Sequence, residues 1–139
     1  VMGAAFALVV AGFVQPSPAG MVAARPEVRG VARITRHPVL MGFGLWGLAH
    51  LLLTSVYAAE LAFFGGFAIF AVVGCEHQDQ RKLAASESYR AFHAATPFLP
   101  FSSPGFVRGL VEMPLPVAIA AGIALAWALR TYAHAWLSG

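Results

Sequence analysis

The run from Pro38 to Ser55, PVLMGFGLWGLAHLLLTS, is the clearest indication of the fold class. It contains no Asp, Glu, Lys or Arg, and its leading proline suits the first turn of a helix. As a helix it would be about 27 Å long, and a run of the same length, 58–75, follows after a short turn. The hydrocarbon core of a bilayer is about 30 Å thick. Each run is therefore predicted to cross a membrane with the help of flanking residues.

Two further apolar runs complete a predicted all-α integral membrane fold, a bundle of about four transmembrane helices. The four predicted spans are 1–14, 38–55, 58–75 and 114–137. Because the first span would be only about 21 Å long, we expect the chain to begin inside a helix, through processing or truncation. One domain, 1–139, is expected from the length.

Polar segments join the spans on one side, over residues 15–37 and 76–113. Tyr89, Phe92 and Thr96 fall at helical spacing, which predicts a short interfacial helix within 76–112. These two loops hold eight of the nine Lys and Arg residues, namely Arg25, Arg29, Arg33, Arg36, Arg81, Lys82, Arg90 and Arg108. The positive-inside rule turns this basic face toward the cytoplasm, stroma or matrix. We expect a bacterial inner membrane or an organellar one, that is, a plastid or mitochondrial inner membrane.

Composition supports the membrane interpretation and excludes several other classes. The chain is 59% hydrophobic and 11% charged, with a mean hydropathy of +0.73, whereas ordinary soluble domains carry about twice that charged fraction. Its single cysteine, Cys75, excludes an internal disulfide and a cysteine-rich metal site. A net charge of +3 is too small and scattered to indicate a nucleic-acid partner. The predicted partners are the lipid bilayer and a hydrophobic small molecule.

Ionisable residues inside a membrane are costly, so the histidines are candidates for function. His50 lies deep in an apolar run, on one helix face with Gly42 and Trp46. It is interpreted either as a metal ligand or as a hydrogen-bond donor to a neighbouring helix. His37 follows Arg36 at a helix start, where an anionic group would be favoured. It is equally a candidate interfacial anchor.

The remaining histidines are weaker candidates. His77 and His93 share the basic face with His37, and His77 lies in a charged segment that would cap the third span. His134, beside Tyr132 and Trp136, is typical of an interfacial belt. Because His37 and His50 would be about 20 Å apart along one helix, one metal ion cannot take both from the same chain. No HExxH spacing occurs.

Glycines recur in the spans, at Gly42, Gly44, Gly47, Gly65, Gly66, Gly74 and Gly122. Small residues let helices approach closely in lipid. Close packing is one interpretation, and room for a planar cofactor is the other.

Several stretches resemble the NnrU family, which includes the plant-type 15-cis-ζ-carotene isomerases. They are Ala32–Pro38 (ARITRHP), Leu45–Leu51 (LWGLAHL), Phe63–Phe67, Asp79–Leu83, Thr96–Phe101 and Met113–Pro116. The resemblance runs from about Arg29 to the C-terminus, and the N-terminal helices of full-length members lie outside this sequence.

For the isomerase branch, the resemblance implies haem b held by histidine, with redox-dependent ligand exchange assisting cis–trans isomerisation of a carotenoid or other hydrophobic substrate. Carried over by position, His50 and His37 are the candidate iron ligands, with Arg36 as a polar partner and Trp46 walling the cofactor pocket. The isomerases are histidine-rich near the end of the third span, where this chain has Cys75-Glu76-His77. His77 and Cys75 are the two candidate replacements, and neither is an evident match.

Two alternatives belong to other classes. The Arg36–Gly42 stretch, with Glu76, Tyr89 and Pro97–Pro100, is also similar to membrane methyltransferases that act on isoprenylcysteine or phospholipid. That resemblance implies S-adenosylmethionine, with Arg36 and His37 on its carboxylate and Glu76 on its amino group. The third possibility is a non-enzymatic accessory subunit that fills lipid-facing space in a larger membrane complex.

Overall fold

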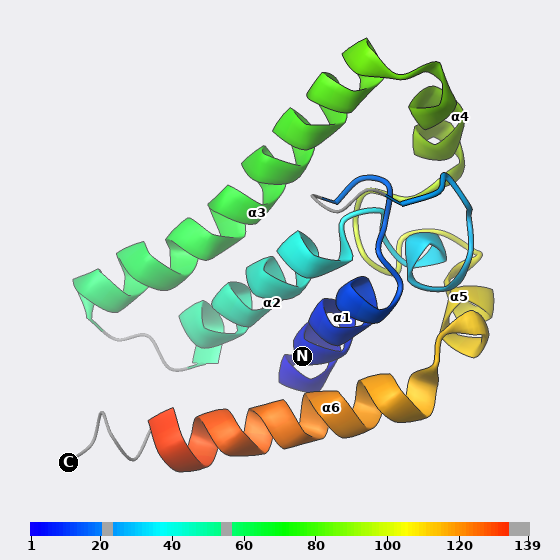
Figure 1. The fold of residues 1–139 in the computed structure, drawn as a ribbon. Helices are drawn as coiled ribbons and strands as arrows, with labels where there is room; N and C mark the ends of the chain where they lie inside the picture. Colours follow the sequence, from blue (N-terminus) through cyan, green and yellow to red (C-terminus); the bar gives the residue numbers. More distant parts are fainter. Residues whose placement is uncertain (21–23, 54–56, 134–139) are drawn as a thin grey trace.

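The computed structural model describes residues 1–20, 24–53 and 57–133, and this part of the chain is all helical, with no strands (Figure 1). The α-helices are α1 (Met2–Val14), α2 (Pro38–Leu53), α3 (Ala58–Ala85), α4 (Glu87–Ala95), α5 (Phe106–Glu112) and α6 (Leu115–Ala128). A short 3-10 helix, η1 (Gly30–Arg33), precedes α2, and a π-helical turn, η2 (Leu129–Ala133), follows α6. His134 and Trp136, placed in an interfacial belt by the sequence, lie outside the described residues.

The long helices form a layered arrangement in which α2 packs between α1 and α3, and α6 packs against the other side of α1 (Figure 1). Glycines bring these helices close together. A Cβ added at Gly42 would lie 2.7 Å from the carbonyl oxygen of Ala5 in α1, and one at Gly47 would lie 2.7 Å from the carbonyl oxygen of Phe64 in α3. Close packing, the first interpretation of the glycine pattern, is confirmed at these two positions.

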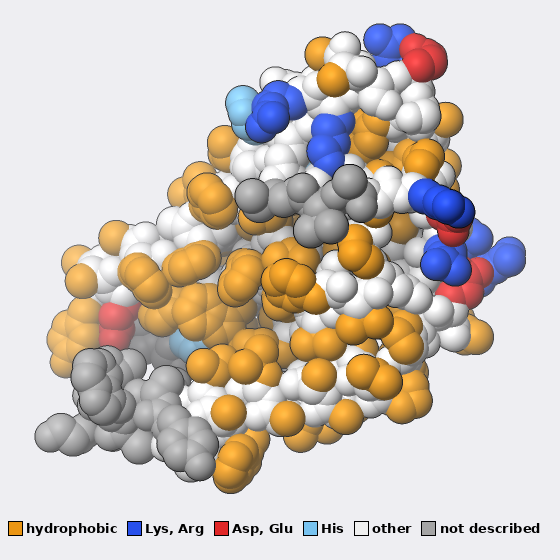
Figure 2. All heavy atoms as spheres, in the orientation of Figure 1, with side chains coloured by type: hydrophobic (Ala, Val, Ile, Leu, Met, Phe, Trp, Pro, Cys, Tyr) orange, Lys and Arg blue, Asp and Glu red, His pale blue; other side chains and the backbone are white. Residues whose placement is uncertain are grey.

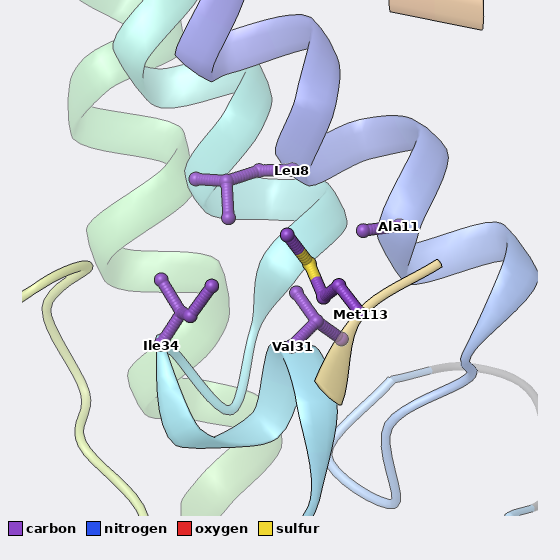
Figure 3. Packing of buried hydrophobic residues seen from close by; sticks show 5 residues of the cluster. All are labelled: Leu8, Ala11, Val31, Ile34 and Met113. Atoms are coloured by element: carbon purple, nitrogen blue, oxygen red, sulfur yellow. The ribbon is translucent and has the colours of Figure 1, made fainter. Parts of the chain in front are cut away.

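A small apolar cluster fixes the polar end of the bundle (Figure 3). Leu8 and Ala11 of α1 meet Val31 of η1, Ile34 and Met113, which lies between α5 and α6. All five side chains are buried. The cluster therefore ties the segment that precedes α2 to both α1 and the start of α6.

Membrane-crossing length is reached by one helix within the described residues, the 28-residue α3. A second is added if α5 and α6, bent by 88°, are counted as one span, and α1 and α2 are shorter apolar helices. Large apolar side chains cover the outside of α3 and α6, among them Phe63, Ile69, Phe70, Val73, Ile123 and Trp127. In Figure 2 hydrophobic surface covers the part of the molecule away from the charged end.

The helices fall on the four predicted apolar runs, with two differences. The third run was predicted to end at Cys75, but α3 continues through the charged segment to Ala85, because that segment packs against the polar end of the protein. The helix expected near Tyr89 is confirmed as α4, whose first turn is capped by the Ser86 hydroxyl accepting a hydrogen bond from the Tyr89 amide. The helix α5 was not predicted.

Candidate functional site

The site lies where the segment before α2 enters the polar end of the bundle. Its backbone is fixed by hydrogen bonds to the 96–101 segment: the Arg36 amide donates to the Pro97 carbonyl at 3.0 Å, and the Thr35 hydroxyl donates to the Phe98 carbonyl at 2.7 Å. The Ser17 hydroxyl donates to the Arg36 carbonyl from the other side. Arg36 and His37 are thus held inside the protein, with His37 only 2% exposed.

Asp79 of α3 is the centre of a buried polar network. Its carboxylate is 1% exposed and accepts from Arg36 Nε at 2.8 Å and from His37 Nε2 at 2.8 Å. The Tyr89 hydroxyl of α4 donates to the same carboxylate. A buried carboxylate requires such partners, because an unpaired buried charge is costly. The network therefore joins the residues that lead into α2 with α3 and α4 through one residue.

Each of the three Arg36 guanidinium nitrogens has a hydrogen-bond partner inside the protein. Besides Asp79, the guanidinium donates to the Thr96 carbonyl at 2.9 Å and lies 3.0 Å from His93 Nε2. It also lies over the Phe98 ring, 5.0 Å from the ring centroid. In the described structure, the guanidinium positions other residues rather than facing a ligand.

Tyr89 acts in this network as a hydrogen-bond donor. Burial and the hydrogen bond to Asp79 both raise the pKa of its hydroxyl above the ordinary value. The hydroxyl therefore stays protonated at neutral pH and donates a hydrogen bond to the carboxylate. This hydrogen bond helps to stabilise the buried negative charge.

His37 has one nitrogen fixed and one without a partner. Because a carboxylate only accepts, Nε2 carries the hydrogen donated to Asp79, and in the neutral ring Nδ1 is then an acceptor. Among the residues that the structure describes, neither the buried Nδ1 nor the buried Gln78 Oε1 has a hydrogen-bond partner. Both residues line a partly open pocket of about 180 Å³, whose other walls include Phe13, Val39 and Leu40. Two unused acceptors thus lie on residues of one largely apolar pocket.

His50 and Trp46 belong to a different place, the contact between α2 and α3. His50 Nδ1 lies 3.0 Å from the Trp46 carbonyl, and its ring stacks on Phe64 with centroids 4.6 Å apart. Trp46 packs edge-on against Phe67 at 5.3 Å. With Gly42 it also lines a second pocket, of about 290 Å³, between α1, α2, α3 and α6. His50 lies near the far end of α2 from His37, as the sequence predicted.

The other predicted residues are not drawn into the network. His77 is exposed on α3, and Glu76 is exposed and accepts a hydrogen bond from Gln80 at 3.0 Å. No three His, Cys, Asp or Glu side chains within residues 1–20, 24–53 and 57–133 are grouped so that they would hold a metal ion. Of the predicted residues, Arg36 and His37 meet in the buried network, whereas His50 and Trp46 meet at the separate contact between α2 and α3.

Sequence reasoning missed Asp79 as a site residue and gave His93 no place in a shared site. It grouped Tyr89 with Arg36 and His37 only through the methyltransferase resemblance. A signal was present: Ala71, Cys75 and Asp79 follow at intervals of four residues and form the buried face of α3. An acid that continues a buried face is a stronger candidate than one on a solvated helix end.

The fold and this network describe an all-helical protein with a buried Arg–His–Asp–Tyr cluster at its polar end. The family model described as NnrU protein matches residues 1–139, so the chain belongs to the NnrU family. Comparison with curated proteins gives no match, and comparison with solved structures gives none either.

Proposed function

We propose that α1, α2, the apolar part of α3, and α6 cross a lipid bilayer, with the basic end on the cytoplasmic, stromal or matrix side. The exposed apolar side chains of α3 and α6 support this, because water would make such a surface costly. The basic residues gather at the opposite end of the molecule (Figure 2), as the positive-inside rule requires.

Single-cysteine labelling tests this orientation. Cys75 is buried, so it is replaced by alanine, and cysteine is placed either at Arg90 on α4 or at the exposed Tyr57 before α3. In right-side-out membrane vesicles we expect a membrane-impermeant maleimide to label Tyr57→Cys but not Arg90→Cys, and inverted vesicles to give the reverse. Labelling of both positions from the same side would contradict the proposal.

We infer that the protein binds a hydrophobic small molecule by its polar end at the pocket beside His37. The observation that carries this inference is a histidine whose Nε2 is fixed by a buried carboxylate, while its Nδ1 has no partner within residues 1–20, 24–53 and 57–133. Buried polar atoms in native structures are almost always hydrogen-bonded, so an unpaired one at a pocket indicates a missing partner. The Asp–His pair would hold the ring in place and accept a proton at Nδ1.

The isomerase resemblance implies haem b. The hydrogen bonding of His37 is compatible with a haem ligand, but the pocket beside it is too small for haem. Metal-ligating histidines usually donate their other nitrogen to a carboxylate or carbonyl, as His37 does. Pockets for cofactors of this kind measure about 300–1,000 Å³, whereas the pocket beside His37 is about 180 Å³. The site as described does not enclose a porphyrin, so we assign no step to haem here. A haem-dependent cis–trans isomerase is the second candidate function.

An absorption spectrum separates these two candidates. We expect detergent-purified protein, oxidised and then reduced with dithionite, to show no Soret band, because the pocket is too small for the porphyrin. A Soret band that shifts on reduction would overturn this expectation and restore the haem-dependent isomerase. The variants His37→Ala and His50→Ala would then identify the iron ligand.

Photolabelling tests the binding proposal itself. Three ten-carbon diazirine probes ending in a hydroxyl, an amine or a carboxylate are added to the protein in liposomes, and crosslinks are mapped by mass spectrometry. We expect at least one probe to label the pocket walls around Phe13 and Val39. Leu40→Trp, which fills the pocket, should remove that labelling.

The matched control is Leu52→Trp, on the same helix but exposed and away from the pocket, which should keep the labelling. Labelling spread evenly over lipid-facing residues with all three probes would contradict a binding site. Under that outcome the accessory-subunit role remains. The methyltransferase alternative gains no support from this geometry, because Arg36 is bound to Asp79 and Glu76 faces outward.

A further inference from the structure

We propose that the ligand of the His37 pocket carries an uncharged hydroxyl group at its polar end, an inference that rests on the binding function proposed above. The ligand class would be a hydrophobic alcohol or phenol rather than a fatty acid, an amine or a pure hydrocarbon. The argument uses the type of the two unpartnered atoms and the charges that surround them.

The two unpartnered atoms are both acceptors. In the neutral imidazole, whose Nε2–H donates to Asp79, Nδ1 accepts, and Gln78 Oε1 is a carbonyl oxygen. A ligand that satisfies them must bring a hydrogen-bond donor. Carboxylates and phosphates in their ionised forms have none, and an ether or a hydrocarbon has none either. Hydroxyl, amide and amine groups are left as donors, and the hydroxyl is the smallest of the uncharged ones.

The charges around the pocket exclude the amine, which is an ammonium at neutral pH. The Lys82 ammonium lies beside the pocket, held by the carbonyls of Pro18 and Gly20, and Gly20 is itself part of the pocket wall. Arg36 adds a second positive charge next to His37, and Asp79 supplies the one negative charge in this network. The group is net positive, which disfavours an ammonium head. A neutral hydroxyl supplies a hydrogen-bond donor and is not repelled by the positive charges.

The pocket walls suit the rest of such a molecule. Phe13, Pro38, Val39 and Leu40 are apolar, and they belong to the ends of α1 and α2 where the apolar helices meet the polar segment. At about 180 Å³ the pocket takes the head and the first few carbons, and it is partly open, so a longer chain would continue outward. Under the orientation proposed above, this places the hydroxyl at the membrane interface and the chain in lipid.

Competition among matched head groups tests the inference. Liposomes at pH 8 contain the wild-type protein and whichever diazirine probe labels the pocket, and unlabelled decan-1-ol, decanoic acid, decylamine or decyl methyl ether competes. We expect decan-1-ol to compete at concentrations at least about tenfold lower than the other three, since a satisfied buried acceptor is worth about 1–3 kcal/mol. Membrane partitioning of each competitor is measured and used to correct its concentration.

The variant Gln78→Leu removes one acceptor and leaves Asp79 and its donors in place. It should weaken competition by decan-1-ol several-fold and leave the ether unchanged, whereas Gln80→Leu, an exposed position two residues on, should behave as wild type. Equal competition by alcohol and ether, or stronger competition by the acid or the amine, overturns the hydroxyl inference while the binding site stands. Absence of pocket labelling by every probe overturns the binding function instead.

Discussion

Asp79→Ala is expected to cause the largest loss of stability of any single substitution in the polar network. The carboxylate is buried and accepts from Arg36, His37 and Tyr89, so its removal leaves a buried guanidinium without its anion. Breaking a buried ion pair from one side costs about 3–5 kcal/mol. The free energy of unfolding is measured in mixed micelles of a mild detergent and SDS, where the fraction of SDS drives unfolding.

The matched control is Glu76→Ala, on the same helix but exposed and bound only to Gln80, which should change the free energy of unfolding by less than about 0.5 kcal/mol. The double variant Arg36→Met, Asp79→Leu should recover part of the loss, because no isolated charge of this pair remains buried. A loss below about 1 kcal/mol for Asp79→Ala would show that the network does not hold the three helices together.

The helices were predictable from the sequence because apolar runs, and the residues that begin and end them, are features of neighbouring residues in the chain. Pro38 begins α2 at the predicted residue, and the run that starts at Ala58 begins α3. What local pattern did not give is the end of α3. The charged segment after Cys75 looks like a solvated helix end, yet Asp79 and Lys82 turn inward, toward Arg36 and toward the carbonyls of Pro18 and Gly20.

The candidate site was predictable only in part, for the same reason. Arg36 and His37 drew attention as polar residues beside an apolar run, and the structure places them together in a buried network. Their partner Asp79 is more than forty residues away in the sequence, and no spacing rule relates them. His50 drew the same attention, but the structure surrounds it with Trp46 and Phe64 at a helix–helix contact. Because burying a polar residue is costly, the sequence singles out polar residues in or beside apolar runs. Only the folded structure shows which of these residues share a site.

Gly42→Ala should destabilise the protein although alanine is the better helix former. The new methyl group would lie 2.7 Å from the Ala5 carbonyl oxygen and 3.1 Å from the Val9 amide nitrogen, both in the α1 backbone, which has no rotamer with which to yield. Helices α1 and α2 must therefore separate, and overpacking of this kind costs about 1–3 kcal/mol. Gly47→Ala should behave alike, because its methyl group would meet the Phe64 carbonyl oxygen in α3 at 2.7 Å.

Gly66→Ala makes the same chemical change on α3 at a position where an added Cβ would meet no heavy atom of the described residues within 4 Å, its chain neighbours and the backbone of its own helix aside. Without a clash the lower backbone entropy of alanine in the unfolded chain should dominate, and the variant should be stabilised by up to about 1 kcal/mol. Unfolding in mixed micelles then gives opposite signs for one substitution at two kinds of site. If Gly42→Ala and Gly66→Ala shifted stability in the same direction, the close approach of α1 to α2 would not be what holds the bundle in this arrangement. Opposite signs would show that the glycines at the helix contacts, Gly42 and Gly47, set the distance between the helices.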